Sequence, residues 1–289
     1  MINSIHGLLT MHNPFFSIII PTYNRAGFLK PCLESVLSQD DPDFELVIID
    51  DGSTDQTAAI IAGLGDQRVK YLRQENKGPA SARNLGLTQA RSKFICFLDS
   101  DDRFRQNKLA VTRQFIQKHP EYKIFHTEEI WYRDGRLLPQ KNAHKKPSGW
   151  VFENAANICS ISISTAAIHR EVFNAVAGFD EAFPACEDYD FWLRATAKFP
   201  IFLIPEVLTI KEGGHPDQQS KKYVAMDRFR IQALLKILES GGLTGEQRRI
   251  AGLSLQAKCR IMALGARNRG SRENALYYER LSQNVAPTN

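Results

Sequence analysis

Apolar runs long enough to cross a membrane are missing from this sequence, since none approaches the roughly 20 residues that a spanning helix needs. Its start also lacks the basic, apolar and small-residue order of a secretion signal. The five cysteines are odd in number, lie far apart and form no CxxC pair. These absences argue against a disulfide framework and a cysteine-based zinc site, and they favour a reducing, cytoplasmic compartment.

A strong excess of one charge is also missing. The chain has 37 Lys and Arg residues against 32 Asp and Glu residues, a net charge of +5. Such a small and diffuse excess does not indicate nucleic-acid binding, so no nucleic-acid partner is expected. The 289 residues are 43% hydrophobic and 24% charged, which is typical of a folded globular protein of one or two domains.

A strand–loop–helix alternation begins at Phe16. Four short, strongly apolar runs predict strands at residues 17–20, 45–49, 69–72 and 94–98. Apolar residues at helical spacing predict helices around residues 28–37, 55–64 and 79–90. This alternation is typical of a parallel sheet with helices on both faces, whose ligands bind beyond the carboxyl ends of the strands.

The second half of the chain has a different character. Asp134-Gly135 lies between two apolar segments and predicts a hairpin turn. Beyond Ser220 the pattern is helical, and Thr244 with Gln247 forms a capping-box signature. We therefore expect three segments, with the second divided into two halves: an N-terminal tail at 1–13, a domain at 14–220 (halves 14–110 and 111–220) and a helical C-terminal region at 221–289.

Polar motifs follow three of the predicted strands: PTYNR at 21–25, DDGSTD at 50–55 and FLDSDD at 97–102. The last places three carboxylates within four residues, and their mutual repulsion is relieved when a cation neutralises them. A hard divalent ion that keeps several waters and also binds phosphate oxygens fits this pattern. Each motif alone is also compatible with a turn, a helix cap or a solvated loop. Their order on one parallel sheet favours a single shared nucleotide site.

Four ordered blocks, FSIIIPTYNR, ELVIIDDGSTD, ENKGPASARNLGL and FICFLDSDD, resemble the nucleotide-binding half of family 2 glycosyltransferases. The resemblance is strong from Phe16 to about Lys118 and continues more loosely to Ser220 through AGFDEAF, EDYDFWLR and GGHPDQQS. One departure is Ala177, where the family often has glycine. The resemblance implies an α/β protein with the GT-A fold, a mostly parallel sheet flanked by helices, with a helical C-terminal appendage.

The resemblance also implies a donor site. Thr22, Tyr23 and Asp51 match positions that hold the nucleotide base, and Arg83 matches one near the base and phosphates. Asp99 and Asp101 match the ribose-side and metal-binding members of the DxD motif. The donor-binding residues implied are Pro21, Thr22, Tyr23, Asn24, Arg25, Asp51, Arg83, Asp99 and Ser100. The divalent ion, manganese or magnesium, is assigned to Asp101 and Asp99, with His215 completing the metal shell or contacting a phosphate. The alternative for His215 is a solvated histidine in a loop.

The EDYD segment carries the candidate catalytic base. Asp188 matches the base position of the family, and Glu187 is its neighbouring rival. A purely structural alternative is a charged helix start, where carboxylates interact favourably with the helix dipole. Asp190 lies four residues before Arg194, a spacing that predicts an ion pair within the helix. Packing in the core or on the acceptor side, rather than sugar stacking, is expected for Trp131, Tyr132, Trp150 and Trp192. Among them Trp192 is the best candidate for a sugar platform, because it lies beside the proposed base.

We therefore predict an inverting, metal-dependent glycosyltransferase that moves a sugar from a nucleoside-diphosphate sugar, by preference a UDP-sugar, to a hydroxyl acceptor. The acceptor expected by family analogy is a bacterial surface glycan or its lipid-linked precursor. Peripheral contact with the inner face of the membrane and pairing of two copies stay open. The alternative is a module that binds a nucleotide sugar without transferring the sugar. The intact metal motif and the intact pair Glu187–Asp188, which we call the ED pair, both argue against this alternative.

Overall fold

The computed structural model describes residues 13–139, 145–214 and 223–284. Its first four strands are parallel neighbours in the order β3–β2–β1–β4. Their bounds are β1 Phe16–Thr22, β2 Phe44–Asp50, β3 Val69–Arg73 and β4 Phe94–Phe97. All four strands predicted from the apolar runs are thereby confirmed. β1, β2 and β4 consist largely of buried β-branched and aromatic residues, which favour an extended backbone.

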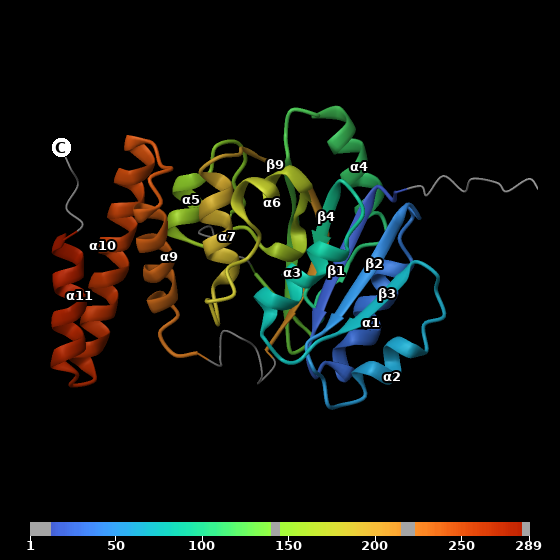
Figure 1. The fold of residues 1–289 in the computed structure, drawn as a ribbon, viewed down its shortest axis with the longest axis horizontal. Helices are drawn as coiled ribbons and strands as arrows, with labels where there is room; N and C mark the ends of the chain where they lie inside the picture. The colour runs from blue at the N-terminus through green and yellow to red at the C-terminus, as the bar shows by residue number, and fades with distance from the viewer. Residues whose placement is uncertain (1–12, 140–144, 215–222, 285–289) are drawn as a thin grey trace, which may run out of the picture.

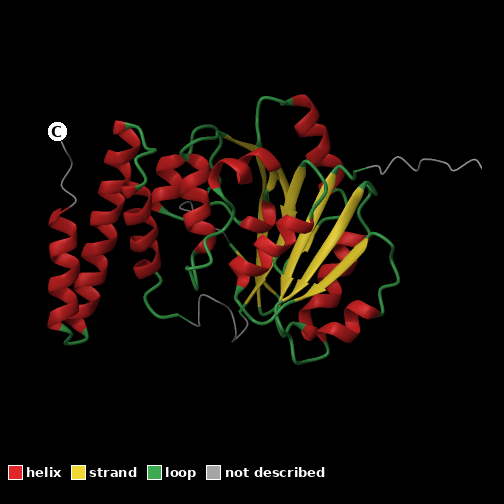
Figure 2. Ribbon diagram, in the orientation of Figure 1, coloured by secondary structure: helices red, strands yellow, loops and turns green. Residues whose placement is uncertain are grey.

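Helices cover both faces of this parallel part (Figure 2). On one face, Ile18 and Ile20 of β1 share an apolar cluster with buried residues of α1 (Ala26–Leu37). On the other, Ile19 packs in a cluster with residues of α3 (Pro79–Gln89). The alternation follows from the two-residue period of a strand. The short α2 (Thr57–Ala62) lies beside α1 (Figure 1).

The sheet continues beyond β4 with mixed strand directions, in the order β4–β8–β6–β9–β5. The bounds are β5 Arg103–Phe104, β6 Ile124–Arg133, β8 Ala167–His169 and β9 Ile201–Gly213. β8 runs antiparallel to both β4 and β6, whereas β9 runs parallel to β6. β7 (Arg136–Leu138) returns along β6 after a turn in which Asp134 and Gly135 have φ of 52° and 73°, so the predicted hairpin is confirmed.

Helices α4 (Lys108–Lys118), α5 (Phe152–Asn157), α6 (Arg170–Val176) and α7 (Glu187–Thr196) complete this part of the molecule. Three further helices form one end of it, away from β1–β3 (Figure 1). They are α9 (Asp227–Glu239), α10 (Gly245–Asn268) and α11 (Arg272–Asn284). An apolar cluster joins α9 and α10 to α5 and α7. The helical C-terminus is therefore confirmed, and it packs against the helix that carries the ED pair.

The start of α10 has the predicted capping box. Thr244 Oγ1 accepts a hydrogen bond from Gln247 N at 3.2 Å, and Gln247 Oε1 accepts one from Thr244 N at 3.0 Å. These two bonds satisfy backbone donors that a helix start otherwise leaves open. None of the helices in the described part of the chain is long and apolar enough to cross a membrane.

Gly86 allows α3 to lie directly on β1. A Cβ at this position would stand 2.4 Å from Ile19 Cγ2, which is closer than two carbon atoms can approach. Because α3 sits this close, Arg83, one turn earlier in the helix, is held near the ends of the strands. The absence of a side chain at Gly86 thus permits the short distance between α3 and β1.

We predict that Gly86→Ala lowers the free energy of unfolding by about 1–3 kcal/mol, because the added methyl group overpacks the contact with Ile19. Denaturant unfolding measures the change. Gly27→Ala is the matched control: its Cβ would meet nothing within 4 Å, and alanine is the better helix former, so no loss is expected. Equal stability of the two variants would contradict the role of Gly86.

Candidate active site

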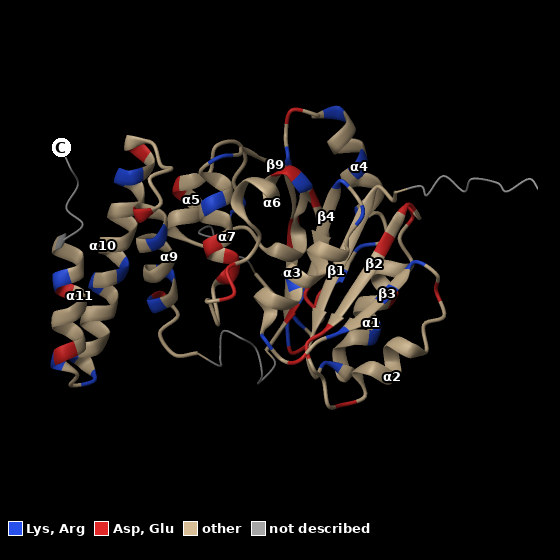
Figure 3. Ribbon diagram, in the orientation of Figure 1, with Lys and Arg blue, Asp and Glu red and all other residues tan. Residues whose placement is uncertain are grey.

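The carboxyl ends of β1, β2 and β4 bring the three polar motifs to one edge of the sheet. Thr22 at the end of β1 is in register with Asp50 at the end of β2, and its carbonyl accepts a hydrogen bond from Asp51 N at 2.8 Å. On the other side of β1, Leu98 N donates to Ile19 O at 3.0 Å. Acidic and basic segments gather at this end of the strands in Figure 3. The convergence expected from the sequence is present.

Asp51 is buried and organises the loop before α3. Its Oδ1 accepts hydrogen bonds from Gln74 Nε2 at 2.6 Å and from Lys77 N at 2.9 Å, and its Oδ2 accepts one from Gly78 N at 2.8 Å. A carboxylate has about four acceptor positions, so Asp51 retains capacity for one more donor. Sequence reasoning missed Gln74, which belongs to none of the motifs.

The PTYNR segment contains an unsatisfied buried group. Thr22 is buried, and its Oγ1 has no hydrogen-bond partner among the described residues. Leaving such a group unpaired costs about 1–3 kcal/mol, which a bound ligand can offset. Tyr23 is 45% exposed beside it, and Asn24 Oδ1 accepts a hydrogen bond from Thr54 N at 2.8 Å. The Oγ1 atom of Thr22 can therefore form a hydrogen bond with a bound ligand.

Arg83 connects the edge formed by the carboxyl ends of β1, β2 and β4 with the Glu187–Asp188 pair. We call this edge the donor edge, after the ligand predicted for it. Its Nη2 lies 2.9 Å from Asp99 Oδ1 and its Nη1 lies 2.5 Å from Glu187 Oε1, and the guanidinium is buried. Burial alone would raise the pKa of Asp99, but Arg83 and Lys211 outweigh it and hold that pKa below its ordinary value. Burial raises the pKa of Glu187 in spite of Arg83. Arg83 Nε has no partner within the described residues and remains available to a ligand.

The three carboxylates of FLDSDD have three different environments. Asp102 is fully buried, accepts hydrogen bonds from Ser164 Oγ and Lys211 Nζ, both at 2.7 Å, and has its pKa raised to about 7 by burial. Asp99 is paired with Arg83. Asp101 makes no ion pair with any described residue, and burial followed by the charge of Asp99 raises its pKa. A bound cation would therefore stabilise the ionised form of Asp101 more than that of Asp99 or Asp102, which already have cationic partners.

Within residues 13–139, 145–214 and 223–284, no three His, Cys, Asp or Glu side chains are grouped as a metal site. His215, assigned to the metal from the sequence, lies outside the described residues. Magnesium-type ions need only one or two carboxylates when waters and phosphate oxygens complete the shell. Asp101, with Asp99 two residues away, fits an ion that is shared with a diphosphate.

Lys211 was not expected from the sequence. It lies on β9, and its Nζ is 2.7 Å from Asp102 Oδ2 and 3.8 Å from Asp99 Oδ2. Burial lowers the pKa of its ammonium, but the carboxylates beside it outweigh this and raise it. No motif could have revealed Lys211, because 109 positions separate it from Asp102.

The carboxylates at the start of α7 also differ from one another. Glu187 is held by Arg83, and the buried Asp190 is held by Arg194 at 2.6 Å and by Lys236. The predicted pair within the helix is thus confirmed. Asp188 pairs with no Lys or Arg of the described chain; its Oδ2 accepts a weak hydrogen bond from Cys159 Sγ at 3.6 Å. Asp188 is consequently the one of these three carboxylates that has no cationic partner among the described residues.

Trp192 does not provide a sugar platform. It is 1% exposed and packs in the apolar cluster between the sheet and α7, in edge contact with Phe191. The sequence favoured packing over sugar binding for this residue and its aromatic neighbours, and that expectation is confirmed for Trp192. Only its place as the best platform candidate among them is excluded.

A family model described as glycosyl transferase family 2 matches residues 17–176, more than half of the chain. The chain belongs to glycosyl transferase family 2. This membership confirms the resemblance that the motifs indicated. The matched range contains the donor edge but ends before the ED pair, so the comparison leaves the roles of the individual site residues as predictions.

Curated relatives share the same part of the chain. An uncharacterized glycosyltransferase of Rickettsia bellii is 35% identical over 184 residues, which cover 63% of this chain and 26% of that protein. The minor teichoic acid biosynthesis protein GgaA of Bacillus subtilis is 34% identical over 204 residues, covering 63% and 43%. The putative teichuronic acid biosynthesis glycosyltransferase TuaG of the same organism is 34% identical over 167 residues, covering 56% and 65%. The first curated relatives are therefore much longer than the part they share with this chain.

Solved structures share the fold over nearly the whole chain. S. aureus TarS 1–349, solved in complex with UDP-GlcNAc, superposes with a TM-score of 0.71 at 21% identity, covering 93% of this chain and 91% of that one. The mannosyltransferase PcManGT of Pyrobaculum calidifontis, solved with GDP-Man and Mn2+, gives 0.63 at 19% identity, covering 96% and 85%. The predicted GT-A fold is thereby confirmed.

We predict that Arg83→Met lowers the free energy of unfolding by about 3–5 kcal/mol, because it leaves two carboxylates beside a buried position that has lost its cation. Urea unfolding measures the loss. The double variant Arg83→Met with Glu187→Gln is expected to recover part of it, since one of the stranded charges is removed.

Arg249→Met is the matched control for this prediction. Arg249 pairs with Glu246 at 2.6 Å on an exposed helix surface, where solvent screens such a pair and it contributes little to stability. If Arg83→Met destabilises the protein no more than Arg249→Met does, the central position given to Arg83 is wrong.

Proposed function

We propose that this protein is an inverting glycosyltransferase that moves a sugar from a nucleoside-diphosphate sugar, specifically a UDP-sugar, to a hydroxyl group of a glycan or lipid-linked glycan. The observation that carries the proposal is the Arg83 bridge, which joins the DxD segment to the start of α7. It brings a nucleotide edge and a free carboxylate, Asp188, into one site. The names of the teichoic and teichuronic acid relatives support a surface polysaccharide as the product.

In the proposed donor half, the residues at the end of each strand bind a different part of the nucleotide sugar. Asp51 and the unsatisfied Thr22 receive the base, while Tyr23, Asn24 and Arg25 border it. Asp99 and Ser100 face the ribose, and Asp101 with Asp99 would hold a manganese or magnesium ion. When bound, this ion stabilises the negative charge that develops on the departing diphosphate. The chain's own cation Arg83 keeps Asp99 ionised for this task.

In the acceptor half, Asp188 acts as the general base. As the acceptor oxygen attacks the anomeric carbon from the side opposite the diphosphate, its proton passes to the Asp188 carboxylate, and attack from that side inverts the configuration. Glu187 is the poorer candidate because Arg83 occupies its carboxylate. The contact from Cys159 and the hydrogen bond from Tyr189 N at 2.7 Å orient Asp188.

We also propose that residues 14–220 form the catalytic unit and that residues 221–289 brace it. The support is the apolar cluster in which Leu234 of α9 and Leu255 of α10 pack with Tyr189 and Leu193 of α7. All five cysteines are free, in keeping with a reducing, cytoplasmic setting. The silent binding module remains the second candidate, but the unpaired Asp188 favours an enzyme.

Asp101→Ala is expected to abolish the metal-dependent part of UDP binding, because Asp101 is the carboxylate of FLDSDD that pairs with no cation of the described residues. Isothermal titration of UDP with and without manganese measures it. Asp66→Ala, which removes a carboxylate paired locally with Arg68 far from the DxD segment, should leave both titrations unchanged. Unaltered UDP affinity of Asp101→Ala in manganese would refute the metal assignment.

Asp188→Asn is expected to keep UDP binding while lowering turnover by about a hundredfold or more, as for loss of a general base. Turnover is measured as UDP release from a panel of UDP-sugars, in hydrolysis or with an acceptor glycan. Near wild-type turnover of Asp188→Asn would place the base elsewhere. Metal-dependent binding by the wild-type protein without turnover of any donor would favour the binding module.

A further inference from the structure

The small net charge of the chain conceals two regions of opposite sign. Residues 1–220 contain 24 Lys and Arg against 27 Asp and Glu, whereas residues 221–289 contain 13 against 5. The net charges are therefore −3 and +8. Figure 3 marks Lys and Arg positions on α9, α10 and α11, at one end of the molecule. An asymmetry of this size indicates an anionic partner for the basic region.

The same region exposes an apolar stripe on α10. Leu253, Ile261 and Leu264 are 44%, 61% and 62% exposed, and Ala257 is exposed between them. Their spacing of four, eight and eleven residues places them on one face of the helix, over a length of about 16 Å. The opposite face, with Leu255, Cys259 and Met262, is buried. No described residue covers the stripe, which we call the α10 stripe.

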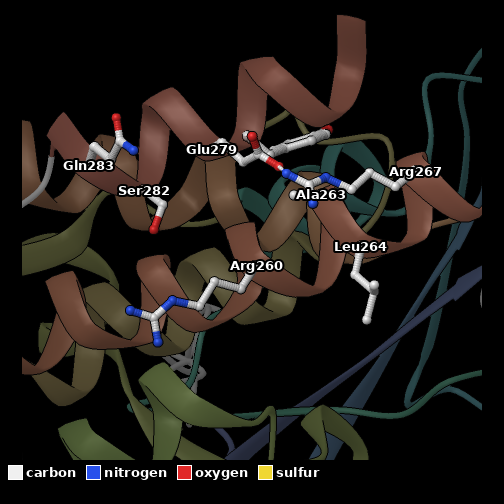
Figure 4. Close-up of a pocket in the computed structure, with 8 residues that line it drawn as sticks. Arg260, Ala263, Leu264, Arg267, Glu279, Ser282 and Gln283 are labelled. Carbon is white, nitrogen blue, oxygen red and sulfur yellow. Dashed lines mark ion pairs between the residues drawn. The ribbon is translucent and has the colours of Figure 1, made fainter. Parts of the chain in front are cut away.

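Guanidinium groups border the α10 stripe. Arg260 and Arg267 lie two turns apart along its edge and are exposed, and Arg260 makes no ion pair within the described chain. A hollow of ≈ 450 Å³ lies beside the stripe, between α10 and α11. Arg260, Leu264 and Arg267 line it, and Figure 4 shows Arg267 paired with Glu279. Apolar and cationic groups thus alternate along one surface.

Three kinds of occupant make different demands on this surface. A second copy of the chain, paired face to face, would bring two rows of arginines together, which repel each other. A polyanion such as a nucleic acid would use the arginines but leave Ile261 and Leu264 in water. The surface of an anionic bilayer uses both features, because apolar side chains enter the acyl boundary while guanidinium groups remain with the lipid phosphates.

We propose that the α10 stripe and its arginines dock on an anionic lipid surface. The docking needs no spanning helix, since a helix lying in the membrane plane buries only one face. It also does not depend on the transfer reaction proposed above, because the contact involves neither nucleotide nor metal. Its effect on that reaction is to hold the catalytic domain where lipid-linked acceptors are concentrated.

The test is flotation of the full chain with phosphatidylcholine vesicles, with and without phosphatidylglycerol, in the absence of nucleotide. We expect binding only to vesicles that contain phosphatidylglycerol, weakening as salt is raised. Ile261→Ser with Leu264→Ser should lower the affinity about tenfold or more, because two side chains no longer enter the acyl boundary. Arg260→Gln with Arg267→Gln should also lower it, through the loss of the two cations that border the stripe.

Leu137→Ser is the matched control, since Leu137 is an exposed leucine on β7, outside the helical region. It should bind vesicles like the wild type. The substituted side chains are exposed, so circular dichroism and thermal unfolding should match the wild type in every variant. Equal vesicle binding by the wild type and the Ile261/Leu264 variant would overturn the proposal. So would a wild-type dimer that this variant dissociates while neither protein binds vesicles.

Discussion

The buried guanidinium of Arg83 is the interaction on which the site depends. It lies between Asp99, at the end of the parallel sheet, and Glu187, at the start of α7. Glu187 follows Arg83 by 104 positions in the chain. A buried charge is tolerated only when its partners neutralise it at hydrogen-bond distance, so both carboxylates are fixed in place around it. This requirement, together with the close packing of α3 at Gly86, locates the donor edge relative to the ED pair.

Carboxylates that are neighbours in sequence have different surroundings. Within FLDSDD, Arg83 pairs with Asp99 and Lys211 pairs with Asp102, whereas Asp101 has no cationic partner among the described residues. Within EDYD, arginines pair with Glu187 and Asp190, whereas Asp188 has no such partner in the described chain. A carboxylate without a counter-charge interacts most strongly with a cation that arrives from outside, and this is why the proposed metal and proton roles fall to Asp101 and Asp188.

The helical C-terminus is related to the site in a different way. Its inner face shares an apolar cluster with α7, and therefore supports the helix on which Asp188 stands. Its outer face exposes the α10 stripe, and residues 221–289 carry a net charge of +8 against −3 for residues 1–220. From α9, Lys236 Nζ contacts both Asp180 and Asp190. Opposite sides of the same helices thus pack on α7 and face solvent.

The sequence by itself determined the elements and the family. Strand period, capping signals and motif order are local, so the four parallel strands, the Asp134-Gly135 hairpin, the Thr244 capping box and the donor edge could be predicted. Only the tertiary structure decided which carboxylates of the described chain lack a cation, and that Lys211 lies against Asp102. The physical reason is that the deciding partners are distant in sequence: Arg83 lies 104 positions from Glu187 and Lys211 lies 109 from Asp102, separations that no local pattern specifies.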